Sequence, residues 1–279
     1  MSKCLAFGEN KISLARPLVM GILNVTPDSF SDGGRFADRE SALAHARQLV
    51  VDGADIVDVG GESTRPGALP VPEAVELERV IPLVEALAGE GVRVSVDTAK
   101  PAVMRAAVAA GAGMVNDIRA LQETGAMEVV AASRAAVCLM HMQGEPRTMQ
   151  AAPSYDDVVT EVRDFLVARA QACEAAGIGR DRIVIDPGFG FGKTVAHNLA
   201  VLRALRMLTA TGYPVLAGLS RKSTLGAITG RNAGERVAAS VAAALAAVAR
   251  GASILRVHDV RETVDAIKVW HAVESGALD

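Results

Sequence analysis

Residues 17–24, PLVMGILN, form an almost continuous apolar run that ends on an asparagine. A strand that is apolar on both faces is typical of a parallel sheet with helices covering each side. The segment after it, TPDSFSDGG at 26–34, lacks the G-x-G-x-x-G pattern that follows the first strand of a dinucleotide-binding sheet. This stretch therefore predicts a parallel α/β fold and disfavours an open dinucleotide-binding sheet.

The same kind of run recurs along the chain with helical patterns between the runs. Seven further runs occupy residues 54–61, 92–98, 112–118, 136–142, 182–188, 213–220 and 252–259. Apolar residues at helical spacing fill residues 39–52, 72–89, 100–110, 155–177, 198–211 and 234–250. Eight strand-then-helix units in about 250 residues predict a (β/α)8 TIM barrel.

The chain is expected to be one domain, 1–279. A length of 279 residues suits a single barrel, since α/β barrels commonly reach about 250 residues as one unit. Residues 1–16 precede the first predicted strand. We expect them to form a small hairpin over the bottom of the barrel, which occupies residues 17–279.

Composition and charge disfavour several classes of partner. Only 3% of the residues are aromatic and the formal net charge is −3, which argues against a nucleic-acid partner. No run of ~18 uncharged apolar residues and no signal-like N-terminus occurs, so we expect no membrane partner. The three cysteines are far apart and outside C-x-x-C pairs, which predicts neither a disulfide framework nor a zinc site and favours a cytoplasmic location.

The glycine-rich segment DPGFGFGKT at residues 186–194 superficially matches a phosphate-binding loop. In that motif a glycine must stand five residues before the glycine of Gly-Lys-Thr. Here that position is Pro187, which has no N–H to offer and a fixed φ. We therefore expect Asp186 to point into the barrel mouth, and Lys193 and Thr194 to face outward where the next helix begins.

Polar residues close all eight predicted strands. In a (β/α)8 barrel the active site lies at the carboxyl ends of the strands, so these residues are the candidates for function. They are Asn24, Asp58 with residues 62–65, Asp97, Asn116 with Asp117, His141, Asp186, residues 220–222, and Arg256 with His258.

The candidates divide by charge. The cationic group is expected to converge with Asn24 on one rim as a site for a polyanion with Mg²⁺, because Mg²⁺ prefers oxygen ligands and needs few from the protein when phosphate supplies others. That group is Arg65, Arg221, Lys222, Arg256 and His258. On the opposite side, Asp97, Asn116 and Asp186 are suited to a heterocycle that presents N–H donors.

Several candidates have a purely structural alternative. Asp97 could cap the helix that begins near Lys100, and Asp117 is expected to serve its own loop. Lys222 could be an ordinary residue of the first helical turn. The other histidines are expected to pack in the core or lie on the surface: His45, His141, His197 and His271.

The motifs together resemble those of the dihydropteroate synthase family, folate-pathway enzymes that sulfonamides inhibit. The matching segments run in order from Met20 to Val260: MGILNVTPDSFSDGG, GADIVDVGGESTRPGA, SVDT, NDI, LMHMQGEPRTMQ, IDPGFGFGKTVAHNL, LSRKS and RVHDV. The resemblance implies a transferase that joins 6-hydroxymethyl-7,8-dihydropterin diphosphate to p-aminobenzoate, releasing diphosphate, with Mg²⁺ as cofactor. It also implies a homodimer.

The resemblance also assigns roles to residues. For the pterin it implies Asp97, Asn116, Asp186, Lys222, Met140, Phe191 and Arg256. For the diphosphate it implies Asn24, Thr64, Arg65, Arg256 and His258, with Asn24 next to the metal. For p-aminobenzoate it implies Thr64, Pro66, Phe191, Lys222 and Ser223. The catalytic residues would be Lys222, Asp97, Arg65 and Asp32, of which Asp32 helps to close the first loop.

Two other functions remain open on this sequence. A methyltetrahydrofolate-binding domain of a corrinoid methyltransferase shares the barrel and binds a pterin, but it has no use for a diphosphate site. A Schiff-base aldolase would use Lys222 as its nucleophile. For the synthase reaction we expect a dissociative, SN1-like path without a covalent enzyme intermediate, because the dihydropterin can stabilise a cation at its exocyclic methylene.

Overall fold

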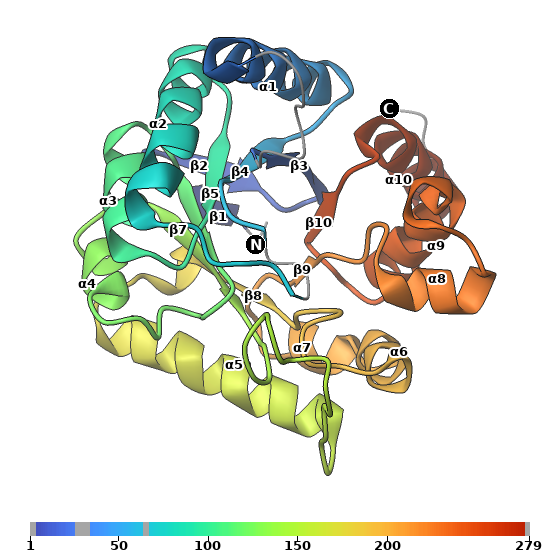
Figure 1. Ribbon diagram of the computed structural model, residues 1–279. Helices are drawn as coiled ribbons and strands as arrows, with labels where there is room; N and C mark the ends of the chain where they lie inside the picture. The colour runs from blue at the N-terminus through green and yellow to red at the C-terminus, as the bar shows by residue number, and fades with distance from the viewer. Residues whose placement is uncertain (1–3, 26–33, 64–66, 277–279) are drawn as a thin grey trace.

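The computed structural model describes residues 4–25, 34–63 and 67–276. Eight parallel strands form its central sheet: β3 (Leu18–Asn24), β4 (Ile56–Gly60), β5 (Val94–Asp97), β6 (Met114–Asp117), β7 (Ala136–Met140), β8 (Ile183–Asp186), β9 (Leu216–Ala217) and β10 (Ile254–Val257). They follow the order β8-β7-β6-β5-β4-β3-β10-β9, and a parallel bridge between Ile185 and Val215 joins the two edges. The predicted (β/α)8 barrel is thus confirmed (Figure 1).

Helices surround this barrel: α1 (Gly34–Val51), α2 (Glu73–Gly89), α3 (Pro101–Ala109), α4 (Ala126–Ala131), α5 (Val158–Ala175), α6 (Val195–Arg203), α7 (Arg206–Thr209), α8 (Ser223–Thr229), α9 (Val237–Val248) and α10 (Val260–Ser275). The helix expected over residues 198–211 is divided into α6 and α7. The six helical ranges had no counterpart of α4, α8 or α10, and α4 and α8, with six and seven residues, are too short to show periodicity.

Alternation along each strand sends side chains to two separate apolar layers. In β4, Val57 and Val59 pack between the barrel and the helices, with Val80 and Leu83 of α2. Ile56 faces the barrel interior instead. Burial on both faces explains why these strands read as continuous apolar runs.

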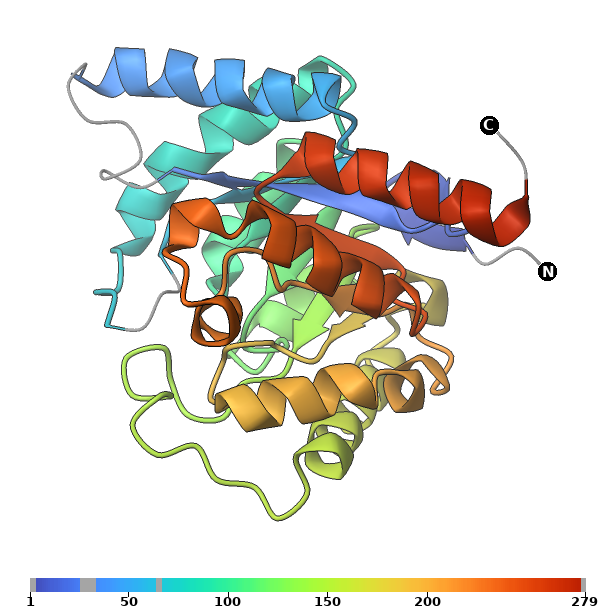
Figure 2. The same cartoon turned by 90° about the vertical axis from the view of Figure 1, so that its right-hand side faces the viewer.

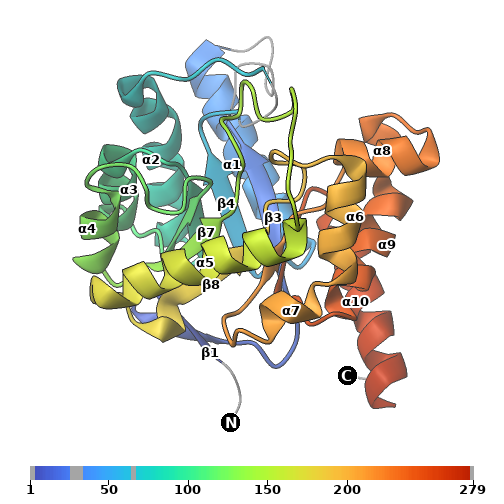
Figure 3. The same ribbon diagram turned by 90° about the horizontal axis from the view of Figure 1, so that it is seen from below.

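A two-stranded antiparallel hairpin, β1 (Cys4–Phe7) and β2 (Asn10–Ser13), closes the bottom of the barrel. Leu5, Phe7 and Ile12 of the hairpin pack against interior residues from the amino-terminal halves of the strands. The ring of Phe7 lies so close to Gly113 that a Cβ there would stand 2.2 Å from Phe7 Cδ1. The expected hairpin is confirmed, and Figures 2 and 3 show it at the end of the barrel away from the loops that follow the strands.

Among the helices that the structure describes, none has both the length and the apolar character needed to cross a lipid bilayer.

Candidate active site

A network of charged side chains links four strands at the carboxyl end of the barrel. Arg256 of β10 donates from Nε to Asp58 Oδ2 of β4 at 2.6 Å and from Nη2 to Asp97 Oδ2 of β5 at 2.7 Å. Asn116 of β6 donates from Nδ2 to the same Asp58 oxygen at 3.0 Å. Asp58 is therefore the centre of the network, and it is fully buried.

For each charged group in this network, burial and the charge of its partner act on the pKa in opposite directions. Burial raises the pKa of Asp97 to about 7, although the positive charge of Arg256 opposes the shift. For Arg256, burial alone would lower the pKa, but the attraction of Asp58 and Asp97 outweighs it and the pKa is raised. Within the described residues, Asp58 Oδ1 is buried without a hydrogen-bond donor. The network can thus accept a further donor.

A second charged pair, Asp186 and Lys222, lies beside this network. Asp186 Oδ1 accepts from the backbone N–H of Gly188 at 2.7 Å, and burial raises the pKa of Asp186 while Lys222 opposes the shift. Burial lowers the pKa of Lys222 to about 8, with Asp186 opposing. Lys222 Nζ donates to the carbonyl of Phe189 and lies 4.7 Å from the centre of the Phe191 ring.

The expected division into a cationic rim and an opposing set of acceptors is wrong for Arg256 and Lys222, and Arg221 is paired with a carboxylate outside that set. Arg256 is held between two carboxylates, Lys222 lies near Asp186, and Arg221 donates from Nε to Asp259 Oδ2 at 3.1 Å. The physical reason is that a buried charge is costly unless a charge of opposite sign lies beside it. Cations and carboxylates of neighbouring strands therefore interleave.

The structure places the remaining candidates as follows. Met140 is buried at the end of β7, and Phe191 is half-buried in the loop after β8. Asn24 ends β3 opposite Gly60. His258 Nδ1 lies 3.1 Å from Ser220 Oγ, and the exposed Ser223 begins α8. Four candidates lie outside the described residues: Asp32, Thr64, Arg65 and Pro66.

Most of the structural alternatives are resolved. Asp97 does not cap α3, because Lys100 occupies the N-cap position without a side-chain bond. Asp117 does serve its own loop, accepting from the backbone N–H groups of Arg119 and Leu121, each at 2.8 Å. The four histidines behave as expected: His45 and His271 are exposed, His197 joins the capping box of α6, and His141 is buried.

Lys193 departs from expectation. Its side chain was expected to face outward, yet Lys193 is only 2% exposed, and its Nζ lies 2.9 Å from Nδ1 of His141. Glycines with positive φ at 188, 190 and 192 fold the loop back over the lysine, and His141 stands 52 residues away in sequence. Thr194 does begin the next helix, as its N-cap.

The sequence analysis placed Asp58 among the strand-end candidates without giving it a role, and it did not place Lys193 in this region at all. For Asp58 a signal was present: it stands two residues before Gly60, so it shares the inward face with the last residue of β4. For Lys193 there was none, since its acceptors come from a loop fold and from a different strand.

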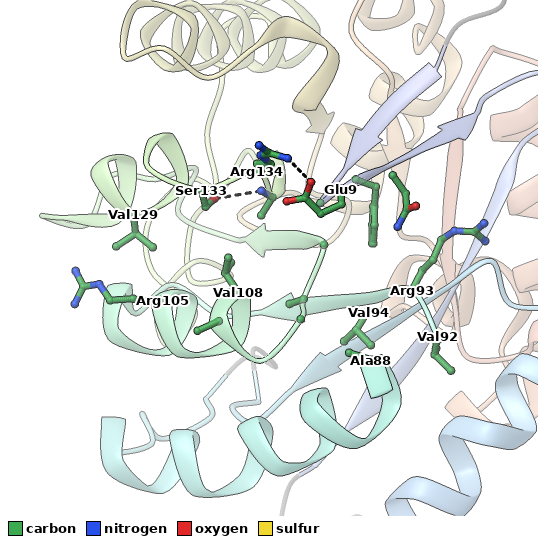
Figure 4. A pocket seen from close by; sticks show the side chains of 18 of the residues that line it. Glu9, Ala88, Val92, Arg93, Val94, Arg105, Val108, Val129, Ser133 and Arg134 are labelled. Carbon is green, nitrogen blue, oxygen red and sulfur yellow. Dashed lines mark hydrogen bonds and ion pairs between the residues drawn. The ribbon is translucent and has the colours of Figure 1, made fainter. Parts of the chain in front are cut away.

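A hollow of about 980 Å³ lies at the other end of the barrel, between the hairpin turn and helices α2 to α4. Its basic residues do not converge: Arg105 and Arg93 lie on opposite sides of it, and Arg134 is paired with Glu9 (Figure 4). The mouth, in contrast, brings together buried carboxylates, an amide and two cations. An active site is recognised by converging reactive side chains more than by the size of a hollow, so the mouth is the candidate active site.

A (β/α)8 barrel with acceptors and cations gathered at its mouth is the arrangement of an enzyme with its active site there. The family model described as pterin binding enzyme matches residues 20–258. Two relatives are the dihydropteroate synthases of Neisseria meningitidis serogroup B, 54% identical over 95% of this chain and 96% of the relative, and of Escherichia coli K12, 50% identical over 95% and 94%. The chain therefore belongs to the dihydropteroate synthase family of pterin-binding transferases.

Solved structures agree with this assignment. Dihydropteroate synthase of Xanthomonas albilineans with 4-aminobenzoic acid superimposes with a TM-score of 0.93 at 56% identity, covering 99% of both chains. The Burkholderia cenocepacia synthase complexed with 7,8-dihydropteroate gives 0.90 at 54% identity, covering 99% of this chain and 98% of that one. The resemblance seen in the sequence is thus confirmed over nearly the whole chain.

Proposed function

We propose that this protein condenses 6-hydroxymethyl-7,8-dihydropterin diphosphate with p-aminobenzoate to give 7,8-dihydropteroate and diphosphate. The observation that carries the proposal is the joined set of Asp97, Asn116, Asp186, Lys222 and Arg256 at the mouth. It offers acceptors for a heterocycle and cations for a leaving group in one place. The bound 4-aminobenzoic acid and 7,8-dihydropteroate of the two solved relatives support the choice of substrates.

In this proposal the pterin ring lies against the acceptors. The amino-pyrimidinone edge of a pterin presents N–H donors, which suit the carboxylates Asp97 and Asp186 and the amide of Asn116. Met140 and Phe191 would line the ring. Arg256 is planar and its orientation is fixed by Asp58 and Asp97, so its guanidinium can stack on the ring.

The diphosphate would lie beyond the paired residues of β3 and β10, the last of which are Gly21 and Val257. Asn24 ends β3 and His258 follows β10, and Arg256 bonds the pterin acceptor Asp97. Thr64 and Arg65 complete the proposed subsite from outside the described residues. These groups would stabilise the negative charge that grows on the departing diphosphate, which is the main electrostatic task of the site.

We propose Mg²⁺ as the cofactor, with Asn24 as its protein ligand. The amide oxygen of Asn24 faces Gly60, and even a Cβ there would be 3.7 Å from it, so no side chain of β4 covers it. The described residues hold no cluster of three or more His, Cys, Asp or Glu that could bind a metal. A sparse donor set suits Mg²⁺, which takes most of its oxygens from phosphate and water. When bound, the ion would neutralise charge on the diphosphate.

The proposed reaction needs positioning more than proton transfer. The bond between the exocyclic methylene and the diphosphate oxygen breaks first, leaving a cation delocalised into the dihydropterin. The amine nitrogen of p-aminobenzoate, held by Thr64, Pro66, Phe191, Lys222 and Ser223, then bonds to the methylene and loses a proton. Lys222, Asp97 and Arg65 would act on the reacting groups, and Asp32 would help to close the site. Isolation of a pterin bonded to a side chain would contradict this path.

We further propose that the chain is a single cytoplasmic domain that forms a homodimer. The buried cysteines Cys138 and Cys173 are free thiols, which suits a reducing compartment. On α10, Val269 and Val273 are 65% and 74% exposed and leave an apolar face on the late helices. Sedimentation equilibrium tests the dimer, and a monomer at all concentrations would exclude it.

The test of the activity is diphosphate release from the two substrates by the wild type, Lys222→Ala and Asp186→Ala. We expect each variant to lose at least about 100-fold in kcat/KM, because each removes a preorganised charge from the site. Lys268→Ala, at an exposed lysine of α10, is the matched control and should equal the wild type. Unchanged turnover in both site variants would refute the site.

The two alternative functions have their own tests. Borohydride trapping of Lys222 with a carbonyl substrate would favour the aldolase. Methyl transfer from methyltetrahydrofolate would favour the methyltransferase domain.

A further inference from the structure

Lys193 is a buried cation that the proposed reaction does not use. Besides Nδ1 of His141, its Nζ has the carbonyl oxygens of Gly188 and Phe191 within 3.1 Å and that of His141 at 3.4 Å. An ammonium group carries three N–H donors, so these acceptors satisfy it fully. The lysine therefore joins both ends of the segment 188–191 to the end of the neighbouring strand.

The other carbonyls of the same loop are also held by side chains. The carbonyl of Phe189 accepts from Lys222 Nζ, that of Gly190 from Gln150 Nε2, and that of Gly192 from the hydroxyl of Tyr155 at 2.7 Å. Among the residues that the structure describes, only Lys193 holds two of the loop carbonyls at once. Without it, the buried carbonyl of Gly188 and Nδ1 of His141 would lose a donor that water cannot easily replace.

The electrostatics of the pair support this arrangement. Burial lowers the pKa of His141 to about 3, with the charge of Lys193 as a second cause, so the imidazole is neutral and can accept at Nδ1. Burial lowers the pKa of Lys193 to about 7, while the negative charge of Asp186 opposes the shift. Lys193 is thus an internal donor shielded from solvent.

We propose that Lys193 is a positioning residue for the p-aminobenzoate subsite: it fixes the loop 188–192, and through it the Phe191 ring and the carbonyl that holds Lys222. This inference rests on the proposed function. The pterin acceptors Asp97 and Asn116 are instead fixed on their strands by the Asp58 and Arg256 network. Phe191 and Lys222 also belong to the proposed pterin site, but Asp97, Asn116 and Arg256 hold their places there without the loop. Loss of Lys193 should therefore affect p-aminobenzoate more than the pterin diphosphate.

The experiment compares Lys193→Met, which keeps the apolar stem and removes the donors, with Thr194→Ala. The second variant removes the N-cap of α6 at the next residue and so weakens the same junction without touching the lysine. For Lys193→Met we expect the KM for p-aminobenzoate to rise about tenfold and that for the pterin diphosphate to stay within about threefold. Thr194→Ala should leave both KM values at the wild-type level.

A second readout needs no turnover. Hydrogen exchange of the Phe191 amide, which donates to the Gly188 carbonyl at 3.0 Å, should be at least about tenfold faster in Lys193→Met and unchanged in Thr194→Ala. If the wild type makes no dihydropteroate, the proposed function fails, while the exchange data still decide whether Lys193 fixes the loop.

The inference is overturned if both KM values rise equally, if neither rises, or if the exchange rate is unchanged. Should Lys193→Met not fold, His141→Leu decides by the same measurements, since it removes one acceptor of the lysine and leaves the carbonyls. We expect a rise of about threefold in the KM for p-aminobenzoate alone, and an unchanged value overturns the inference.

Discussion

The two ends of the barrel interior are built from the same strands and have opposite chemistry. Near the amino-terminal ends the inward side chains are apolar and the hairpin covers them, among them Leu18, Met20, Ile56, Met114 and Ile254. Two residues further along β4, β6 and β10 the inward positions hold Asp58, Asn116 and Arg256, and the ends of β5 and β8 add Asp97 and Asp186. A single change of composition along each strand thus separates the part that stabilises the fold from the part that can do chemistry.

The difference has an energetic side. Apolar burial at the bottom is favourable in itself, whereas taking charges out of water at the mouth is only partly offset by their pairing. The mouth is therefore expected to weaken the fold relative to an apolar filling, and the bottom to compensate for it.

The largest expected effect is at the centre of the mouth. Arg256→Gln leaves two buried carboxylates without their cation, so we expect the free energy of unfolding to fall by about 3–5 kcal/mol and kcat/KM by more than about 100-fold. Steady-state kinetics and urea denaturation measure both. The double variant Asp58→Asn with Arg256→Gln should recover much of the stability and none of the activity. If the double variant recovered activity, the charges of Asp58 and Arg256 would not be needed for catalysis.

At the bottom, the expected loss is in stability alone. Phe7→Ala removes a buried ring from the hairpin, which should lower the free energy of unfolding by about 3–5 kcal/mol and leave kcat/KM of the folded enzyme unchanged. Gly113→Ala is the matched variant, because its Cβ would stand 2.2 Å from the Phe7 ring; overpacking should cost about 1–3 kcal/mol.

The two bottom variants should also interact. Since Gly113→Ala is costly only while the Phe7 ring is present, the double variant should be less destabilised than the sum of the two single ones. A change in either substrate KM on Phe7→Ala would break the separation between the two ends.

The smallest expected effect is a pH dependence of stability. The pKa of Asp97 is raised from 3.8 to about 7 by burial, so the folded state binds this proton more tightly than the unfolded chain. The free energy of unfolding should therefore fall as the pH rises from about 4 to about 7. Asp97→Asn should flatten this slope in denaturation curves taken across that range.

A surface carboxylate provides the opposite case. The pKa of Asp157 is lowered by its side-chain bond with Thr160 and by further bonds at the start of α5, so its stabilising contribution is present at neutral pH and is lost as the pH falls through the folded pKa. Asp157→Asn should remove a slope of that sign. If Asp97→Asn also removed a slope of that sign, burial would not be the dominant cause of the pKa shift of Asp97 at the mouth.

The sequence predicted the frame of the molecule because alternation and apolar runs are local signals. The first strand was expected over residues 17–24 and is found at Leu18–Asn24, and the residues that end the strands do gather at one mouth. The pairings among them were not predictable, since Arg256 and Asp58 are 198 residues apart and only the closed barrel makes them neighbours. The division of the cations from the carboxylates failed for this reason.

The loop at residues 186–194 shows how far a motif can mislead. In a phosphate-binding loop the backbone N–H groups point inward and hold an anion. Here the glycines turn the carbonyls inward, and the carbonyls hold the ammonium groups of Lys193 and Lys222. A similar glycine-rich sequence thus forms a loop in which carbonyl acceptors, and not N–H donors, face the bound group. The ammonium groups of the protein's own lysines take the place of a bound ion. A Gly-Lys-Thr match by itself therefore does not show whether the loop offers backbone donors or acceptors. The motif also requires a glycine five residues earlier, and here that position is Pro187.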